Sequence, residues 1–199
     1  MTNQAGTITW AICEHTMRGV EPPPDEPVAP YMARWRATVA RHPLLAALGS
    51  GICLGPIGIL CSFVVSNVVL HLLPPEQWGN SGAAHLDRLD PAMFFFLALV
   101  FAPVIETVLG QVLPMEAARR LGAGPAAQIL LSGLVWGCGH YASGGLVHGI
   151  TAVFGGLVFA CGYAALRPAG IRPAYVAAAS AHATQNGIIW ALMVSAAAA

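Results

Sequence analysis

Five apolar stretches of about membrane-spanning length constrain this fold more than any other feature of the sequence. A transmembrane helix needs about 20 mostly apolar residues to cross about 30 Å of hydrocarbon. Proline opens four of the five stretches, which suits the first turn of a helix because its missing N–H has no partner there. A barrel strand would be shorter and would alternate polar with apolar residues. The stretches are residues 43–73, 91–113, 125–141, 145–166 and 173–196.

The sequence therefore predicts an all-α fold, a polytopic membrane helix bundle of about five transmembrane helices. Of the 199 residues, 56% are hydrophobic and 9% are charged, whereas a soluble domain has about 25% charged residues. Residues 1–42 show no signal peptide and are expected to form a cytoplasmic, partly irregular tail. Residues 43–199 are expected to form the transmembrane domain. The net charge is zero, which offers no basic surface for nucleic acid.

Arginine sets the expected orientation. Seven arginines flank the stretches on one side, and Arg88 alone falls on the other. Because cytoplasmic loops are enriched in basic residues, we expect a cytoplasmic N-terminus, an external C-terminus and an odd number of spans. The chain would then be an integral protein of the bacterial inner membrane. The seven are Arg34, Arg36, Arg41, Arg119, Arg120, Arg167 and Arg172.

Four polar side chains inside the apolar stretches mark a candidate site: Glu106, His140, His182 and Asn186. A charge at mid-bilayer costs about 2.5–3.5 kcal/mol on insertion scales, so such residues usually face a protein interior or a wet cavity. Counted from the arginine-marked face at 1.5 Å per residue, they lie at depths of about 14–22 Å, which overlap within about one turn. His182 and Asn186 are four residues apart and share a helix face. We expect the four to converge.

Other polar residues have ordinary explanations. His148 begins the fourth stretch and is expected to be interfacial. Glu116 can form surface pairs with the arginines at i+3 and i+4. The five cysteines form no CxxC pair and are expected to be small apolar fillers. Cys138 and His140 would point about 200° apart on a helix, which is poor geometry for a Cys–His pair.

Three short motifs carry a resemblance to a known family. Residues 102–111 (Ala-Pro-Val-Ile-Glu-Thr-Val-Leu-Gly-Gln) resemble the first motif of the CPBP family, the CAAX proteases and bacteriocin-processing enzymes also called Abi. That motif is a proline, two residues, a Glu-Glu pair, three residues and an arginine. Residues 136–140 (Trp-Gly-Cys-Gly-His) resemble the second motif, FxxxH, and residues 182–186 (His-Ala-Thr-Gln-Asn) resemble the third, HxxxN. The motifs follow the family's order, and the protease-like core would cover about 91–196.

Three positions depart from these motifs. Thr107 stands at the second glutamate, Gln111 at the arginine, and Trp136 at the phenylalanine. Losing one acid and one base together keeps the local charge balanced, which indicates a coupled change. We expect these three residues to support the site.

The resemblance implies an intramembrane endopeptidase that hydrolyses a peptide bond of a membrane-anchored or membrane-embedded protein. Glu106 would activate water as general base, His140 would hold and polarise that water, and His182 and Asn186 would donate to the oxyanion. No cofactor is favoured. In a zinc version, Glu106, His140 and His182 would be the ligands, but the sequence lacks HExxH and a second carboxylate to act as base.

Other functions compete with this one. A catalytically inactive relative that binds and scaffolds membrane partners is favoured by Thr107 and Gln111. A haem protein with His140 and His182 as axial ligands would leave Glu106 without a role. A small transporter would need an inverted repeat, which the sequence lacks. The depth count leans toward the outer half of the bilayer and so favours bacterial substrates other than prenylated proteins.

Overall fold

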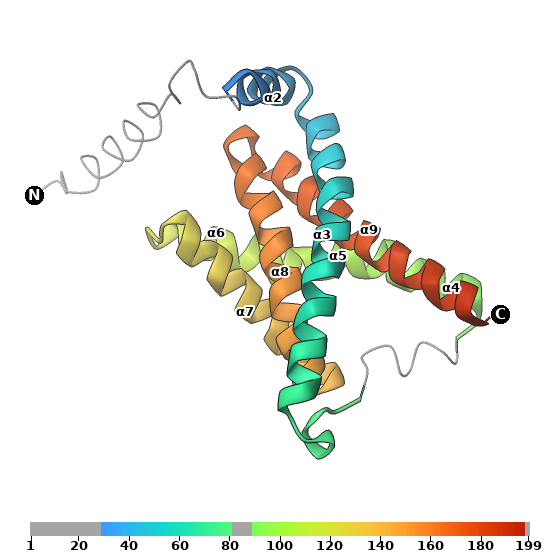
Figure 1. Cartoon of the computed structure of the whole chain (residues 1–199). Helices are drawn as coiled ribbons and strands as arrows, with labels where there is room; N and C mark the ends of the chain where they lie inside the picture. The colour runs from blue at the N-terminus through green and yellow to red at the C-terminus, as the bar shows by residue number, and fades with distance from the viewer. Residues whose placement is uncertain (1–28, 81–88, 198–199) are drawn as a thin grey trace, which may run out of the picture. The chain divides into compact units, whose positions relative to one another are not determined.

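The computed structural model describes residues 29–80 and 89–197, and every regular element within these ranges is a helix (Figure 1). The prediction of an all-α fold is therefore confirmed. The chain divides into two compact units, residues 1–38 and 39–199. Helix α2 (Ala29–Arg41) begins in the first unit, and the other helices belong to the second.

The helices of the second unit follow the five predicted stretches. The second stretch is one long helix, in which α4, α5 and α6 are joined by two π-helical segments, Leu97–Phe101 and Val108–Val112. Asp90 caps its start, since its Oδ1 accepts a hydrogen bond of 2.9 Å from Ala92 N. The helices are α3 (Pro43–Leu72), α4 (Pro91–Phe96), α5 (Ala102–Thr107), α6 (Leu113–Arg120), α7 (Pro125–Gly144), α8 (Leu146–Leu166) and α9 (Ile171–Ala197).

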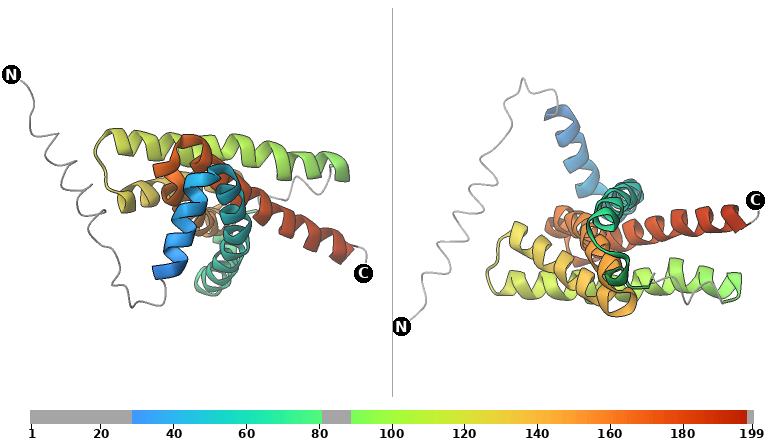
Figure 2. Two further views of the ribbon diagram at one scale, coloured as in Figure 1. Left: turned by 90° about the horizontal axis from the view of Figure 1, so that it is seen from above. Right: turned by 60° about the horizontal axis from the view of Figure 1, so that its bottom comes forward.

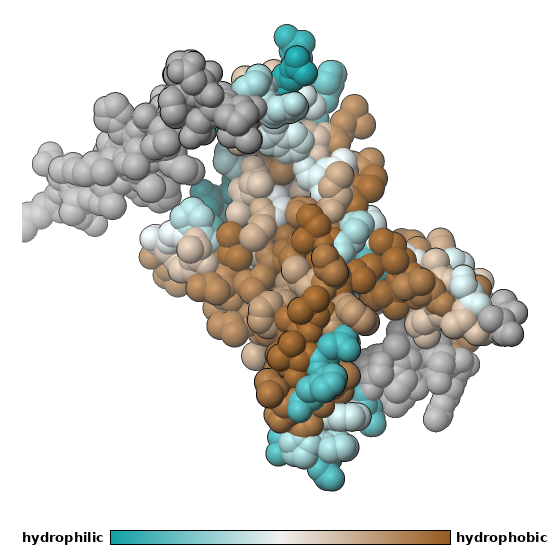
Figure 3. Space-filling model, viewed as in Figure 1, coloured by the Kyte–Doolittle hydropathy of each residue, from teal (hydrophilic) through white to brown (hydrophobic). Residues whose placement is uncertain are grey.

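Three helices within the described residues are long and apolar enough to cross a membrane: Pro43–Leu72, Ala92–Arg120 and Leu146–Ala169. Hydrophobic residues cover much of α3 and α9 on the face drawn in Figure 3. A large exposed apolar surface of this kind is expected where lipid is the solvent. Together these features describe a membrane helix bundle. Helices α7 and α9, which carry His140, His182 and Asn186, are not among these three, and their crossing of the bilayer stays a prediction.

Small residues let α9 pack closely against α3. Four alanines of α9 are fully buried, at positions 174, 177, 178 and 181. A Cβ on Gly51 of α3 would lie 2.6 Å from the carbonyl oxygen of Ala177, and one on Gly55 would lie 2.6 Å from Cβ of Thr184. Close approach through small residues four apart is typical of helix contacts in membranes. These glycines of α3 therefore serve helix contact, within a helix that continues through Pro56.

A tight turn joins α7 to α8. Gly145 has φ 86° and ψ −169°, a region that is essentially restricted to glycine. A Cβ there would also lie 2.6 Å from Cα of Gly79. Val147 N donates to Trp78 O at 3.2 Å, which anchors the start of α8 on the segment after α3. The helices α7 and α8 thus form an antiparallel hairpin.

A buried carboxylate ties α6 to the end of α8. Glu116 is only 8% exposed, and it pairs with Arg119 at 3.2 Å. It also accepts hydrogen bonds from Tyr163 Oη at 2.9 Å and from two nitrogens of Arg167. The interpretation of Glu116 as an ordinary surface pair was therefore incomplete, because its main partner lies 51 residues away in the sequence.

Candidate active site

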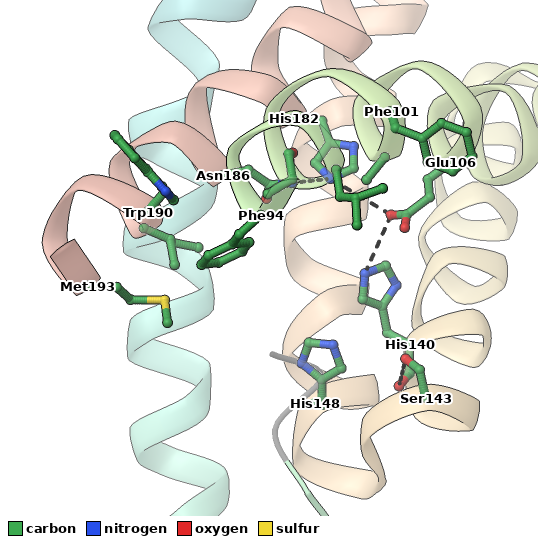
Figure 4. A pocket seen from close by; sticks show the side chains of 14 residues that line it. Phe94, Phe101, Glu106, His140, Ser143, His148, His182, Asn186, Trp190 and Met193 are labelled. Carbon is green, nitrogen blue, oxygen red and sulfur yellow. Dashed lines mark hydrogen bonds and ion pairs between the residues drawn. The ribbon is translucent and has the colours of Figure 1, made fainter. Parts of the chain in front are cut away.

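Glu106 faces two imidazoles from two other helices. Its Oε2 lies 4.0 Å from Nε2 of His140 on α7 and 3.8 Å from Nε2 of His182 on α9 (Figure 4). Both separations exceed a direct hydrogen bond, but both suit a single bridging water. Asn186 lies one turn after His182, with Nδ2 3.0 Å from His182 Nε2. The structure thus brings together all four polar residues that the depth count placed at one level.

The helix that carries Glu106 is irregular on both sides of it. The π-helical segments Leu97–Phe101 and Val108–Val112 flank α5, and such segments are frequent at functional sites. The first segment contacts α9, and the left view of Figure 2 shows the two helices diverging toward the C-terminus of α9. Within it, the carbonyl oxygen of Ala98 accepts a hydrogen bond of 2.8 Å from Asn186 Nδ2. This bond holds the site residues of α9 against the Glu106 helix.

The hydrogen-bond partners assign the proton positions of the two imidazoles. His140 Nδ1 lies 2.9 Å from the carbonyl oxygen of Trp136. A carbonyl can only accept, so Nδ1 carries a proton, and in the neutral ring the lone pair on Nε2 faces Glu106. The Ala98 carbonyl also can only accept, so the atom of the Asn186 amide that faces it is the nitrogen. The second N–H of that amide then points at Nε2 of His182, which accepts it and carries its own proton on Nδ1.

Trp136 forms the platform between the two imidazoles. Its ring stacks on His140, with centroids 5.3 Å apart, and meets His182 edge to face at 4.9 Å. The side chain is buried. It fits because Gly110 and Gly156 have no Cβ, since one on either glycine would collide with the indole. The expectation that Trp136 supports the site agrees with this packing.

A cavity of about 420 Å³ opens in front of these residues. One part of the lining is polar, and Figure 4 shows Glu106, His140 and His182 pointing into the cavity. The rest of the wall is apolar and comes from α4, the first π-helical segment and the C-terminal half of α9. Its larger residues are Phe94, Leu97, Phe101, Ile189, Trp190 and Met193. A partly apolar pocket with a few convergent polar groups is typical of a ligand or active site.

His148 and Ser143 line the same cavity, although neither was assigned a role from the sequence. The His148 ring lies 5.0 Å from that of His140, centroid to centroid. The two histidines stand four residues on either side of Gly144, so a tight helical hairpin must place them side by side. That symmetry about a Gly-Gly turn is the signal that could have revealed His148.

Thr107 and Gln111 lie away from the cavity and are fully buried. Gln111 Nε2 donates to the carbonyl oxygen of Gly156 at 3.2 Å, and its Oε1 accepts from Ser132 Oγ at 2.6 Å. These bonds join the Glu106 helix to α7 and α8. Thr107 Oγ1 has no hydrogen-bond partner within the part of the chain that the structure describes.

A zinc ion held by Glu106, His140 and His182 would require the Asn186 amide to turn away from His182. Nε2 of His182 accepts the amide N–H of Asn186, and a metal would need that same lone pair. Among the described residues, no group of three or more His, Cys, Asp or Glu side chains is placed to hold a metal ion.

A carboxylate that faces two imidazoles and an amide inside an apolar helix bundle is the arrangement expected of a membrane-embedded acid–base hydrolase. The chain belongs to the Rce1-like family of type II CAAX prenyl endopeptidases, whose family model matches residues 88–188, just over half of the chain. That range contains all four site residues, and it confirms the resemblance to CAAX proteases. The family and the apolar helices together make this an integral membrane protein. No curated protein and no solved structure matches the chain.

Proposed function

We propose that this chain is a metal-free intramembrane endopeptidase, and that it cleaves a membrane-anchored or membrane-embedded protein in the bacterial inner membrane. The observation that supports this most is the position of Glu106 Oε2, about equally far from Nε2 of His140 and of His182. The carboxylate is 45% exposed toward the cavity, whereas His182 is only 5% exposed. Glu106 is therefore the group of the site best placed to meet a water and a substrate.

In the proposed first step, a water donates one hydrogen bond to Glu106 Oε2 and the other to His140 Nε2. Glu106 takes a proton from this water as its oxygen attacks the carbonyl carbon of the peptide bond. His140 can accept in the tautomer that carries its proton on Nδ1, which donates to the Trp136 carbonyl. The product of this step is a tetrahedral intermediate with a negative oxygen.

The oxyanion is placed beside Asn186 and His182. One N–H of the Asn186 amide stays on the Ala98 carbonyl and keeps the group in position. The second N–H, which faces His182 Nε2, also donates to the oxyanion as it forms. His182 keeps its proton on Nδ1, and its Nε2 orients the Asn186 amide that donates. Glu106 finally gives its proton to the leaving amine, and the peptide C–N bond breaks.

The apolar wall of the cavity supports a substrate that arrives with an apolar segment. Phe94 on α4 and Trp190 and Met193 on α9 face the polar groups across the cavity (Figure 4). An apolar wall of this character suits a peptide bond next to a membrane anchor or within a transmembrane segment. The N-terminus is proposed to face the cytoplasm, as the arginine distribution predicts.

A comparison of membrane proteomes tests this function. Cells that contain the wild-type protein should show new protein termini that are missing with Glu106→Gln, a substitution that keeps the shape of the side chain but removes the base. Both proteins must be present at equal levels in the membrane. Identical termini in the two strains would refute the endopeptidase function.

The same variant separates the enzyme from a non-catalytic scaffold. The scaffold alternative rests on Thr107 and Gln111, the two positions where a family acid and base are missing. A scaffold would keep its membrane partners with Glu106→Gln, and its cellular effect would be unchanged. An endopeptidase would keep its partners but lose processing.

A further inference from the structure

Helix α2 (Ala29–Arg41) is too short to be stable by itself. It has 13 residues and no acidic side chain in its first turn, where a negative charge would stabilise the helix dipole. Isolated helices shorter than about 12–15 residues are marginal in water, and in proteins most of their stability comes from a surface that covers an apolar face. Helix α2 therefore needs a partner surface, and its side chains indicate which kind.

The large apolar residues of α2 lie on one face. At 3.6 residues per turn they cover about 100° of the helix circumference. They are Tyr31, Met32, Trp35 and Val39. Val39 packs against the buried core, whereas the other three are exposed in the part of the chain that the structure describes. Thr38 borders this face, and its hydroxyl donates within the helix to the carbonyl oxygen of Arg34 at 3.0 Å.

Three arginines flank the apolar face of α2, and the helix contains no acidic residue. Arg36 lies about 90° from the centre of the face on one side, and Arg34 and Arg41 lie about 110–130° from it on the other. An arginine in such a position can lay its stem along an apolar surface and keep its charge in water. Basic residues around an apolar face that carries tyrosine and tryptophan are typical of a helix that lies in a membrane interface.

The chain also holds α2 next to a membrane-spanning helix. Only His42 separates it from α3, which is long and apolar enough to cross a membrane. His42 has φ −138° and ψ 63°, outside the helical region, and the residue before a proline is disfavoured in a helix. Helix α2 is therefore a separate helix that ends where α3 begins, and it is not an extension of that span.

We propose that α2 is a lipid-binding helix. Its apolar face inserts into the interface of the membrane surface at which α3 begins, and its three arginines bind the phosphates of anionic lipid headgroups. The planar guanidinium group suits phosphate, because it can donate two parallel hydrogen bonds. Each arginine near an anionic surface strengthens binding about fivefold, so three contribute about a hundredfold. This inference is independent of the reaction at Glu106 and of which side of the membrane the N-terminus faces.

Hydrogen–deuterium exchange of the full-length protein tests this inference, with one molecule in each lipid nanodisc. The nanodiscs contain phosphatidylcholine alone or phosphatidylcholine mixed with phosphatidylglycerol, which is anionic. Exchange is followed on peptides that cover residues 29–41. Peptides from α8 in the same sample report whether the rest of each variant is folded. One molecule per disc excludes protection of α2 by a second copy of the chain.

The amides of α2 should exchange at least about tenfold more slowly in the anionic discs than in the neutral ones. Replacing Arg34, Arg36 and Arg41 together by glutamine should abolish this difference, and replacing them by lysine should preserve most of it. Trp35→Gln should speed exchange in both lipids, whereas Ala37→Gln, on the opposite face of α2, should not. Equal exchange in the two lipids would overturn the inference. So would equal effects of Trp35→Gln and Ala37→Gln.

Discussion

Replacing Asn186 by alanine should lower both the turnover rate and the stability, with the larger energetic effect on the turnover rate. The amide makes two contacts, 2.8 Å to the Ala98 carbonyl and 3.0 Å to His182 Nε2. Losing the first leaves a partly buried acceptor unpaired, which costs about 1–3 kcal/mol in the free energy of unfolding. In the proposed mechanism the same amide donates to the oxyanion, and removal of one such donor costs about 2.7–4 kcal/mol, or about 100- to 1,000-fold in kcat.

The assay separates these two effects. Cleavage of a membrane-anchored reporter that carries a Glu106-dependent cleavage site is followed in membranes under saturating substrate. Thermal unfolding is followed on the detergent-purified protein. Because the oxyanion bond exists only in the transition state, kcat should fall while KM stays nearly constant. Ser180→Ala is the control, since the Ser180 hydroxyl also donates a hydrogen bond to a backbone carbonyl on α9 but does not line the cavity that contains Glu106 and Asn186. A fall of less than about tenfold in kcat per folded enzyme for Asn186→Ala would show that Asn186 does not donate to the oxyanion.

Four further substitutions and one reagent test the remaining structure. Trp136→Ala should cost about 3–5 kcal/mol of stability, while Trp136→Phe should keep most of both stability and activity, as measured by thermal unfolding and reporter cleavage. Glu116→Gln leaves the buried side of Arg167 without its counter-charge and should destabilise by about 3 kcal/mol, seen as a lower Tm. Gly145→Ala should cost about 1–3 kcal/mol from its backbone conformation alone, with more added by the clash at Gly79. A zinc chelator should leave reporter cleavage unchanged, and inhibition that added zinc reverses would restore the metal-dependent alternative.

The positions of the helices could be predicted because their signals are local. Apolar length, an opening proline and flanking arginines all lie within each stretch, and the structure places a helix over every one. The depth of Glu106 or His140 along its helix follows from the same counting, since the rise per residue is fixed. What counting cannot supply is rotation about the helix axis, and rotation decides whether two residues at one depth face each other.

The features that sequence reasoning missed depend on contacts between distant segments. The partner of Glu116 is Arg167, on another helix, whereas the sequence offers closer arginines. The role of the α3 glycines depends on Ala177 and Thr184, which lie opposite Gly51 and Gly55 and are more than 120 residues away in the sequence. The π-helical segments have no simple composition signal either. One of them is held through Asn186, which lies 88 residues beyond Ala98.

The first motif lacks its second glutamate and its arginine, and this changes which groups can carry the protons of the proposed reaction. With Thr107 and Gln111 in those positions, Glu106 is the one carboxylate among the described residues that lines the candidate active-site cavity. A single carboxylate must then both take the proton from water and return it to the amine, so the neighbouring groups have to stay uncharged and orienting. His140 satisfies that requirement in the tautomer that carries its proton on Nδ1, where Nδ1 donates to the Trp136 carbonyl and Nε2 is an acceptor toward Glu106. The buried Gln111 contributes differently from an arginine: it adds no charge and joins the Glu106 helix to α7 and α8 through Ser132 and Gly156. Losing the second acid and the arginine together therefore keeps the same net charge at the site, while the role of holding the base in place passes to uncharged hydrogen bonds.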